Sequence, residues 1–228
     1  YNDGIGKVEY VDHMGTDITV VNAARVSFGK HKEILDAKDE KLIKYLIKHK
    51  HTSTMEHNSV TFRIKVPLFI RSQHHRHRTW SYNECSRRYT EENLEFYAPK
   101  TFRTQSKSNR QASNLDNIDP IMGYFEDGGA NYASAVIRSH HRWSVSLYNE
   151  LMEKGVCREQ ARGILPQNLY TEYYGTTSMG NLLKFIELRT HDGAQWEIQQ
   201  VAHACLSIAE ELWPITIAAY REIRGLKV

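Results

Sequence analysis

The feature that most constrains the fold is the strictly alternating segment SVTFRIKV at residues 59–66. Because successive side chains of a β-strand point to opposite faces, this alternation of apolar and polar residues predicts a strand with one buried and one solvated face. Pro67 follows at once, and proline suits the first turn of a helix. The segment PLFIRSQHH (67–75) is therefore predicted to be helical.

Helical and strand patterns continue on both sides of this strand. Helices are predicted at residues 17–28, with Asp17 as the N-cap, and at 35–50, 131–154, 157–165, 181–189 and 194–213. Further strands are predicted at residues 7–12, 94–99 and 168–178. Residues 100–120 are polar and almost aperiodic, so we expect a long loop there that is either mobile or a lid.

Length and composition predict a single domain with a sizeable core, since the 228 residues are 40% hydrophobic and 25% charged. No run approaches the roughly 18 to 20 apolar residues of a membrane span, and neither a signal peptide nor a membrane anchor is visible. The three cysteines show no Cys-x-x-Cys spacing, which argues against a disulfide framework and a zinc site. We therefore expect an intracellular, cytoplasmic protein with no membrane partner.

Positive charge is concentrated in one segment. Residues 63–88 carry seven Lys or Arg and one acid, a local charge of 7 − 1 = +6, whereas the whole chain carries +3 and the remainder 3 − 6 = −3. Guanidinium groups bind phosphate bidentately and small polar side chains fill the remaining acceptors, so RHRTWSYNECSRR (76–88) predicts a nucleotide or polyanion pocket. A strip that binds a nucleic-acid polymer is the alternative, which the acidic remainder of the chain disfavours.

Several side chains of this segment allow more than one interpretation. The spacing of His74, His75 and His77 can bind a metal, but cationic neighbours repel a divalent ion and no carboxylate cluster accompanies them, so no metal site is predicted. Cys85 is either a thiolate nucleophile activated by nearby arginines or a small, half-buried side chain. No Gly-rich phosphate loop is present, so any nucleotide must be held in another way.

Arg189 occupies an unexpected position on the helix predicted at 181–189. At 100° per residue it lies about 20° from Leu182, on the apolar stripe. Because burying an unpaired guanidinium costs roughly several kcal/mol, Arg189 must have an accepting partner, either a structural acid or the polar edge of a ligand. Cys205 recurs with apolar residues at helical spacing and is predicted to be in the core.

The segment RHRTWSYNECSRRY (76–89) resembles the signature of flavin-dependent thymidylate synthases, in which Arg-His-Arg is followed by Ser-x-Asn-Glu-x-Ser-x-Arg-Tyr. Nine positions match: Arg76, His77, Arg78, Ser81, Asn83, Glu84, Ser86, Arg88 and Tyr89. Five more segments resemble the family in the same order, at residues 23–28, 56–73, 95–99, 158–171 and 185–200. The resemblance therefore spans nearly the whole chain.

This resemblance implies an α+β fold with helices around a central, mostly antiparallel sheet, forming one domain over residues 1–228 and a homotetramer with shared active sites. It also implies an enzyme that binds FAD, takes dUMP as substrate, methylenetetrahydrofolate as one-carbon donor and NADPH as reductant, and makes dTMP without a cysteine nucleophile. A flavoprotein of the same fold that lacks synthase activity is a further alternative.

The resemblance assigns roles to individual residues. The implied cofactor contacts are His51, Ser53, Arg76, His77, Arg78, Glu84, Ser178, Gly180 and Lys184. The implied dUMP contacts are Gln73, Arg76, Glu84, Cys85, Ser86, Arg87, Arg88, Arg162 and Arg189, and Arg189 is the catalytic residue that polarises the uracil ring. Relatives often carry Asn-x-Arg where this chain has Ser178, Met179 and Gly180, often Asn at Lys184, and a polar residue at Gly193. The side-chain contacts with the flavin at 178–184 therefore depart from the family pattern, whereas contacts through the backbone do not depend on these side chains.

Overall fold

The computed structural model describes residues 1–226 apart from residue 2 and residues 87–93 and 109–111. Contacts divide the chain into two compact units, each assembled from three separate segments. The first unit comprises Tyr1–Lys7, Lys65–Gln73 and Glu84–Glu172, and the second unit comprises Val8–Ile64, His74–Asn83 and Tyr173–Val228.

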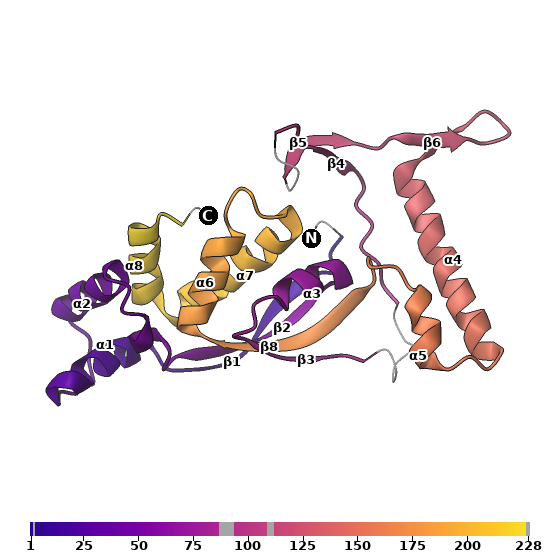
Figure 1. The fold of residues 1–228 in the computed structure, drawn as a ribbon. Helices are drawn as coiled ribbons and strands as arrows, with labels where there is room; N and C mark the ends of the chain where they lie inside the picture. The colour runs from indigo at the N-terminus through magenta and orange to yellow at the C-terminus, as the bar shows by residue number, and fades with distance from the viewer. Residues whose placement is uncertain (2, 87–93, 109–111, 227–228) are drawn as a thin grey trace. The chain divides into compact units, whose positions relative to one another are not determined.

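Helices and strands are mixed along the chain (Figure 1). The strands are β1 (Lys7–Met14), β2 (Ser59–Pro67), β3 (Ser81–Glu84), β4 (Phe102–Gln105), β5 (Ser113–Ile118), β6 (Ile121–Tyr124), β7 (Ala130–Tyr132) and β8 (Tyr170–Ser178). The α-helices are α1 (Asp17–Arg25), α2 (Ala37–Lys48), α3 (Leu68–His74), α4 (Ala133–Glu153), α5 (Arg158–Ala161), α6 (Met179–Arg189), α7 (Trp196–Leu212) and α8 (Pro214–Arg224). Short 3-10 helices are η1 (Val26–Phe28), η2 (Thr52–Met55) and η3 (Arg162–Ile164).

The main sheet has the strand order β1-β2-β8-β3. The strand predicted at 59–66 is confirmed as β2, and its alternation corresponds to alternating burial, because Val60, Phe62, Ile64 and Val66 are buried. Pro67 ends this strand, so the helix begins one residue later than predicted, at Leu68.

The helices of the second unit enclose an apolar core. In this unit α6 packs on α7, and α8 packs on both α7 and α2. Phe185 of α6 and Ile198 of α7 are fully buried, as is Trp213 between α7 and α8, and Cys205 of α7 is fully buried as the helical spacing predicts. The predicted helices 35–50, 181–189 and 194–213 are thereby confirmed as α2, α6 and α7.

The start of α1 differs from the prediction. Thr16, not Asp17, is the N-cap and forms a capping box with Thr19. The buried carboxylate of Asp17 instead accepts hydrogen bonds from the backbone N–H groups of Ile215 and Thr216, at 3.1 and 2.8 Å. Asp17 thus satisfies the free donors in the first turn of α8, a helix that was not predicted from the sequence.

The prediction of a loop at 100–120 is wrong. Strands β4 and β5 form an antiparallel ribbon in which Phe102 pairs with Ile118. The ribbon is held by polar side chains, since Arg103 Nε donates to Ser113 Oγ at 2.9 Å. The described side chains of β4 and β5 are all exposed or half-buried, so the ribbon is not expected to show the alternation of a half-buried strand.

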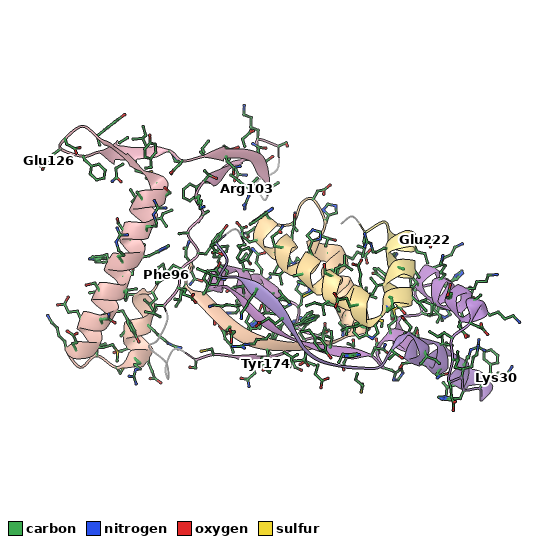
Figure 2. The ribbon with its side chains drawn as sticks, turned by 180° about the vertical axis from the view of Figure 1, so that it is seen from behind. Lys30, Phe96, Arg103, Glu126, Tyr174 and Glu222 are labelled. Carbon is green, nitrogen blue, oxygen red and sulfur yellow. The ribbon has the colours of Figure 1, made fainter. Side chains whose placement is uncertain are left out.

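A second antiparallel pair, β6 and β7, follows and was also not predicted; Glu126 lies at the tip of its turn (Figure 2).

The strand predicted at 94–99 is also wrong. Only Phe96 forms a bridge, with Leu169, although the backbones of Glu95 and Tyr97 bond to Tyr170 and Asn168 beside it. An apolar cluster of the first unit lies here, in which Phe96 packs against the side chains of Tyr148, Ala161, Leu165 and Leu169.

The mixed helices and antiparallel sheets agree with the expected fold class, and the homotetramer stays a prediction. No helix among the described residues is long and apolar enough to cross a membrane.

Candidate active site

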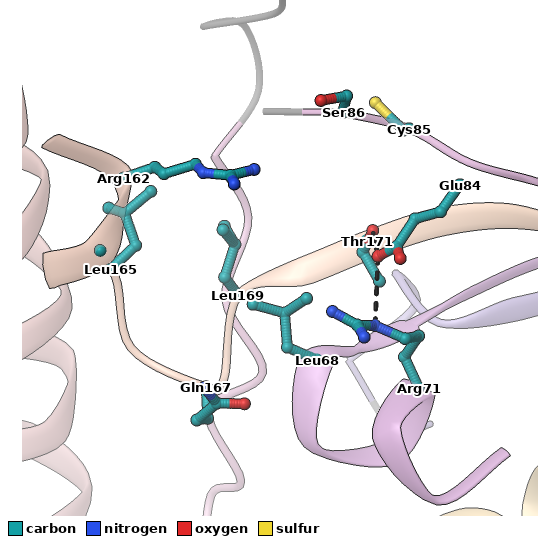
Figure 3. A pocket seen from close by; sticks show the side chains of 11 residues that line it. Leu68, Arg71, Glu84, Cys85, Ser86, Arg162, Leu165, Gln167, Leu169 and Thr171 are labelled. Carbon is teal, nitrogen blue, oxygen red and sulfur yellow. Dashed lines mark hydrogen bonds and ion pairs between the residues drawn. The ribbon is translucent and has the colours of Figure 1, made fainter. Parts of the chain in front are cut away.

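The first unit contains a cavity of about 460 Å³ (Figure 3). Leu68, Leu165 and Leu169 form its apolar part. Its polar lining comes from four parts of the chain and includes Arg71 of α3, Glu84 of β3, Cys85 and Ser86 just after it, Arg162 of η3, Gln167, and Thr171 of β8. A volume of this size lies in the range of small-molecule sites, roughly 300 to 1,000 Å³.

The Glu84 carboxylate is held in a fixed position in this cavity. The Thr171 hydroxyl donates to Glu84 Oε1 at 2.7 Å, and Arg71 Nε lies 3.2 Å from the same oxygen. Next along the chain, the Cys85 N–H donates to the Glu172 carbonyl at 2.9 Å. The cavity thus offers one fixed carboxylate beside two guanidinium groups, those of Arg71 and Arg162, which suits an anionic ligand that also carries donor groups.

Some of the residues expected to contact dUMP line this cavity. Glu84, Cys85, Ser86 and Arg162 line it, whereas Gln73 does not. Arg76 and Arg189 belong to the second unit, and Arg87 and Arg88 lie outside the described residues.

Sequence reasoning did not assign Arg71 or Thr171 to the site. Arg71 lies in the basic segment and in the family-like segment 56–73, and Thr171 lies in the strand-forming segment 168–178 and at the end of the family-like segment 158–171. Neither signal assigned a role to the individual residue.

In the second unit, Arg189 has the accepting partner that its position requires. Its Nε donates to His77 Nε2 at 3.1 Å. Burial and the Arg189 charge lower the pKa of His77 to about 4, so the imidazole is neutral with its proton on Nδ1. Burial, followed by the charge of Arg76, lowers the pKa of Arg189 itself. The partner is therefore an imidazole, not the structural acid that was one of the expectations.

Aromatic packing fixes the turn that carries His77. His74 is fully buried, its Nδ1 lies 2.7 Å from the Tyr173 hydroxyl, and burial holds its pKa well below the usual value. The Tyr82 hydroxyl donates to the carbonyls of His74 and His77 at 2.9 and 3.1 Å. The Trp80 ring packs edge-on against His74 with 4.5 Å between centroids. Within the described part of the chain, no three or more His, Cys, Asp or Glu residues are placed to hold a metal ion.

The expected cofactor residues of the second unit fall into separate groups. His51 and Ser53 line a second cavity of about 450 Å³, together with Lys50 and with the hydroxyl-bearing residues Ser27, Thr52 and Thr54. The hydroxyl, imidazole and ammonium groups that line this cavity can donate hydrogen bonds to the diphosphate and the ribityl chain of FAD, so the residues present fit that cofactor.

The remaining cofactor positions do not line this second cavity. The Ser178 hydroxyl accepts from the Asn181 N–H at 3.4 Å as the N-cap of α6. Gly180 is buried against η2, where an added Cβ would lie 3.7 Å from the Thr52 carbonyl oxygen. Lys184 is exposed and donates to Asn181 Oδ1 at 3.4 Å. Arg76 and Arg78 are also exposed, so the side chains of Arg76, Arg78 and Lys184 are not buried in the core and can contact a ligand.

Comparison with known proteins gives consistent matches. The family model described as thymidylate synthase complementing protein matches residues 9–215. The chain is 42% identical over 217 residues to the flavin-dependent thymidylate synthase of Thermus thermophilus, covering 95% of this chain and 76% of that protein. It is 40% identical over 215 residues to the enzyme of the same name from Thermosipho africanus, covering 94% of this chain and 90% of that protein.

A solved structure also matches the whole fold. The UMP/dUMP methylase PolB from Streptomyces cacaoi, bound with 5-Br dUMP, superposes with a TM-score of 0.81 at 32% identity, covering 98% of this chain and 97% of that chain. Together with the matched signature and the cavity built around Glu84, these similarities show that the chain belongs to the flavin-dependent thymidylate synthase family of enzymes.

Proposed function

We propose that this protein is an FAD-dependent thymidylate synthase that converts dUMP to dTMP, with methylenetetrahydrofolate as one-carbon donor and NADPH as reductant. The observation that carries the proposal is the first-unit cavity, which gathers Glu84, Cys85, Ser86 and Arg162 from separate segments. Relatives that carry the name flavin-dependent thymidylate synthase and a methylase bound with 5-Br dUMP support the same substrate.

The cavity residues have the chemistry that a uridine nucleotide requires. Arg162 supplies a guanidinium for a phosphate or a carbonyl oxygen, and Ser86 supplies a hydroxyl. Glu84, fixed by Thr171, accepts hydrogen bonds from a donor on the nucleotide. Arg87 and Arg88, which lie outside the described residues, complete the proposed phosphate contacts.

Arg189 is the proposed catalytic residue. Its Nε is occupied by neutral His77, so the two terminal nitrogens of the guanidinium remain to bind the uracil carbonyl and favour negative charge on the ring. Negative charge on the ring raises the electron density at C5, the carbon that accepts the one-carbon unit. A homotetramer with shared active sites, also part of this proposal, allows the residues of one site to come from more than one copy.

FAD is proposed to bind through His51, Ser53 and the neighbouring hydroxyls of the second cavity. When bound, the flavin supplies the hydride that reduces the transferred carbon to a methyl group. The chain's own contribution is to hold the cofactor and to orient the uracil, and a protein thiolate is not required. We place this activity in the cytoplasm, within one domain spanning the chain.

The decisive experiment is a single turnover. Purified protein is reconstituted with FAD, reduced with NADPH without oxygen, and mixed with dUMP and methylenetetrahydrofolate while dTMP and flavin absorbance are followed together. We expect one dTMP per flavin oxidised, and a parallel reaction with UMP tests the broader substrate range of the methylase from Streptomyces cacaoi. A protein that takes up no FAD, or that oxidises flavin without forming a methylated nucleotide, contradicts the proposal.

A further inference from the structure

We propose that Arg71 binds the phosphate of the nucleotide, as a partner of Arg162 in the first-unit cavity. This inference rests on the proposed nucleotide function and adds to it a residue outside the family signature. Arg71 is on α3, five positions before the Arg-His-Arg sequence, and lines the cavity together with Arg162 and Ser86.

The first support is the hydrogen-bonding state of the Arg71 side chain. Its Nε lies 3.2 Å from Glu84 Oε1, but this ion pair lacks hydrogen-bond geometry, and Nε is a buried donor without a hydrogen-bond partner among the described residues. Glu84 Oε1 already accepts the Thr171 hydroxyl. The ion pair with Glu84 therefore leaves the hydrogen-bonding capacity of the Arg71 guanidinium unfilled, and its terminal nitrogens can bind a ligand that brings acceptor oxygens.

The second support is the direction of the guanidinium. In Figure 3 the terminal nitrogens of Arg71 lie toward the side of the cavity from which Arg162 extends. The Arg71 side chain is 29% exposed, so it is accessible to a ligand while its stem is held by the protein. A planar guanidinium in this position presents the paired donors that match phosphate oxygens.

The third support is the charge of the cavity lining. Two guanidinium groups face one carboxylate, that of Glu84, and no carboxylate of the described chain forms an ion pair with Arg162. A phosphate monoester carries a charge of about −1.5 to −2 at neutral pH. The two guanidinium groups and the one carboxylate leave a local charge of 2 − 1 = +1, which favours an anionic ligand in reach of both Arg71 and Arg162.

An alternative is that Arg71 only holds Glu84 in place. The two roles differ in their dependence on the ligand: a phosphate contact affects dUMP and leaves deoxyuridine, which lacks the phosphate, unaffected. A residue that acts through Glu84 affects both ligands equally.

The test measures binding of dUMP and of deoxyuridine by calorimetry for four proteins. Arg71→Met removes the charge at similar length, Arg71→Lys keeps the charge without the paired donors, and Arg142→Met is the control, an exposed arginine of α4 outside the cavity. We expect Arg71→Met to weaken dUMP binding by about tenfold or more and to leave deoxyuridine binding within about twofold, with Arg71→Lys between. The control should match the wild type.

Equal weakening of both ligands, or no change in either, overturns the inference while the proposed function stands. If Arg71→Met does not fold, as judged by circular dichroism, the comparison of dUMP with deoxyuridine in Arg71→Lys decides. If the wild type binds neither ligand, the nucleotide function fails, and inorganic pyrophosphate tests Arg71 alone. A rise in melting temperature with pyrophosphate that Arg71→Met loses supports the phosphate contact, and any other result overturns it.

Discussion

Burial and the neighbouring guanidinium of Arg189 lower the pKa of His77 and keep its imidazole neutral. A protonated imidazole cannot accept the hydrogen bond from Arg189 Nε, and a charged guanidinium at 3.1 Å opposes a second positive charge. Neutral His77 therefore fixes the plane of the Arg189 guanidinium and adds no charge to it. The histidine of the signature acts on the proposed catalytic arginine through this one bond.

The first prediction concerns acid stability. Folded His77 has a pKa of about 4, below the 6.5 expected in the unfolded chain. As the pH falls through this interval the unfolded state takes up a proton that the folded state does not, so the free energy of unfolding decreases. His77→Gln keeps an acceptor oxygen but removes the titration, so urea denaturation should show a smaller decrease for the variant. Parallel decreases in both proteins would contradict the assigned pKa.

The second prediction concerns Cys85, which lines the proposed nucleotide cavity and is exposed. Since the proposed reaction uses no enzyme thiolate, Cys85→Ser should retain most of the dTMP formation in the single-turnover assay. Serine keeps a hydroxyl in place of the thiol at nearly the same size. If the variant folds normally and takes up FAD but forms no dTMP, the alternative that Cys85 acts as a thiolate nucleophile would be supported instead.

Sequence reasoning found the cavity residues that belong to a contiguous signature. Glu84, Cys85 and Ser86 are consecutive, so the pattern itself identified them. Arg71 could not be found in this way, because its role depends on where α3 places it against the loop that follows β3. The need for a partner of Arg189 was predictable from helical periodicity, whereas the identity of that partner, His77, required the fold.

Among the elements, α1 and α8 are coupled by one side chain. Asp17 lies in the first turn of α1 and accepts from two N–H groups in the first turn of α8, so its carboxylate interacts favourably with the positive ends of both helices.

The third prediction concerns this coupling. Asp17→Ala leaves two buried N–H groups without an acceptor, and we expect the free energy of unfolding to fall by about 1 to 2 kcal/mol or more. Chemical denaturation followed by circular dichroism measures the change. Asp116→Ala, at an exposed aspartate of β5, is the control and should leave stability nearly unchanged. Equal stability of the two variants would show that water replaces the Asp17 carboxylate.

Elements with an apolar face were predictable from sequence, and polar elements were not. In strand β2 and helix α7, apolar residues recur at the spacing of the strand or the helix, because one face of each lies in the core. The β4–β5 ribbon is rich in polar side chains and is held by backbone and side-chain hydrogen bonds, so its sequence has no such period. Asp17 was assigned to the nearer helix because its true partner is remote in the sequence.

At the scale of the molecule, the two units are interleaved along the chain. Each takes three segments, and the five boundaries fall within strands β1, β2, β3 and β8 and within helix α3 rather than in linkers. No shift in composition marks such boundaries, so the sequence could not reveal them. The single domain over residues 1–228 stays a prediction.

The fourth prediction is the assembly state. Light scattering after size exclusion should give four times the chain mass of 26.5 kDa, 4 × 26.5 = 106 kDa. Large apolar side chains of the first unit are exposed in one chain, including Met122, Tyr124, Phe125 and Trp143. Self-association would bury part of such a surface, which is otherwise costly to leave in water. A mass of one chain at micromolar concentration would contradict the homotetramer.

The hydrogen bonds between the start of α1 and the start of α8 can form only late in the synthesis of the chain. Gly15 and Asp17 bind Trp213, Ile215 and Thr216, which are 198 or 199 positions further along the chain. At about 5 to 20 residues per second, a ribosome needs roughly 10 to 40 s to make that interval. Throughout it, the nascent second unit lacks the donors that Asp17 binds in the finished fold. We therefore expect arrested nascent chains to stay sensitive to protease near α1 until Thr216 has left the ribosomal tunnel.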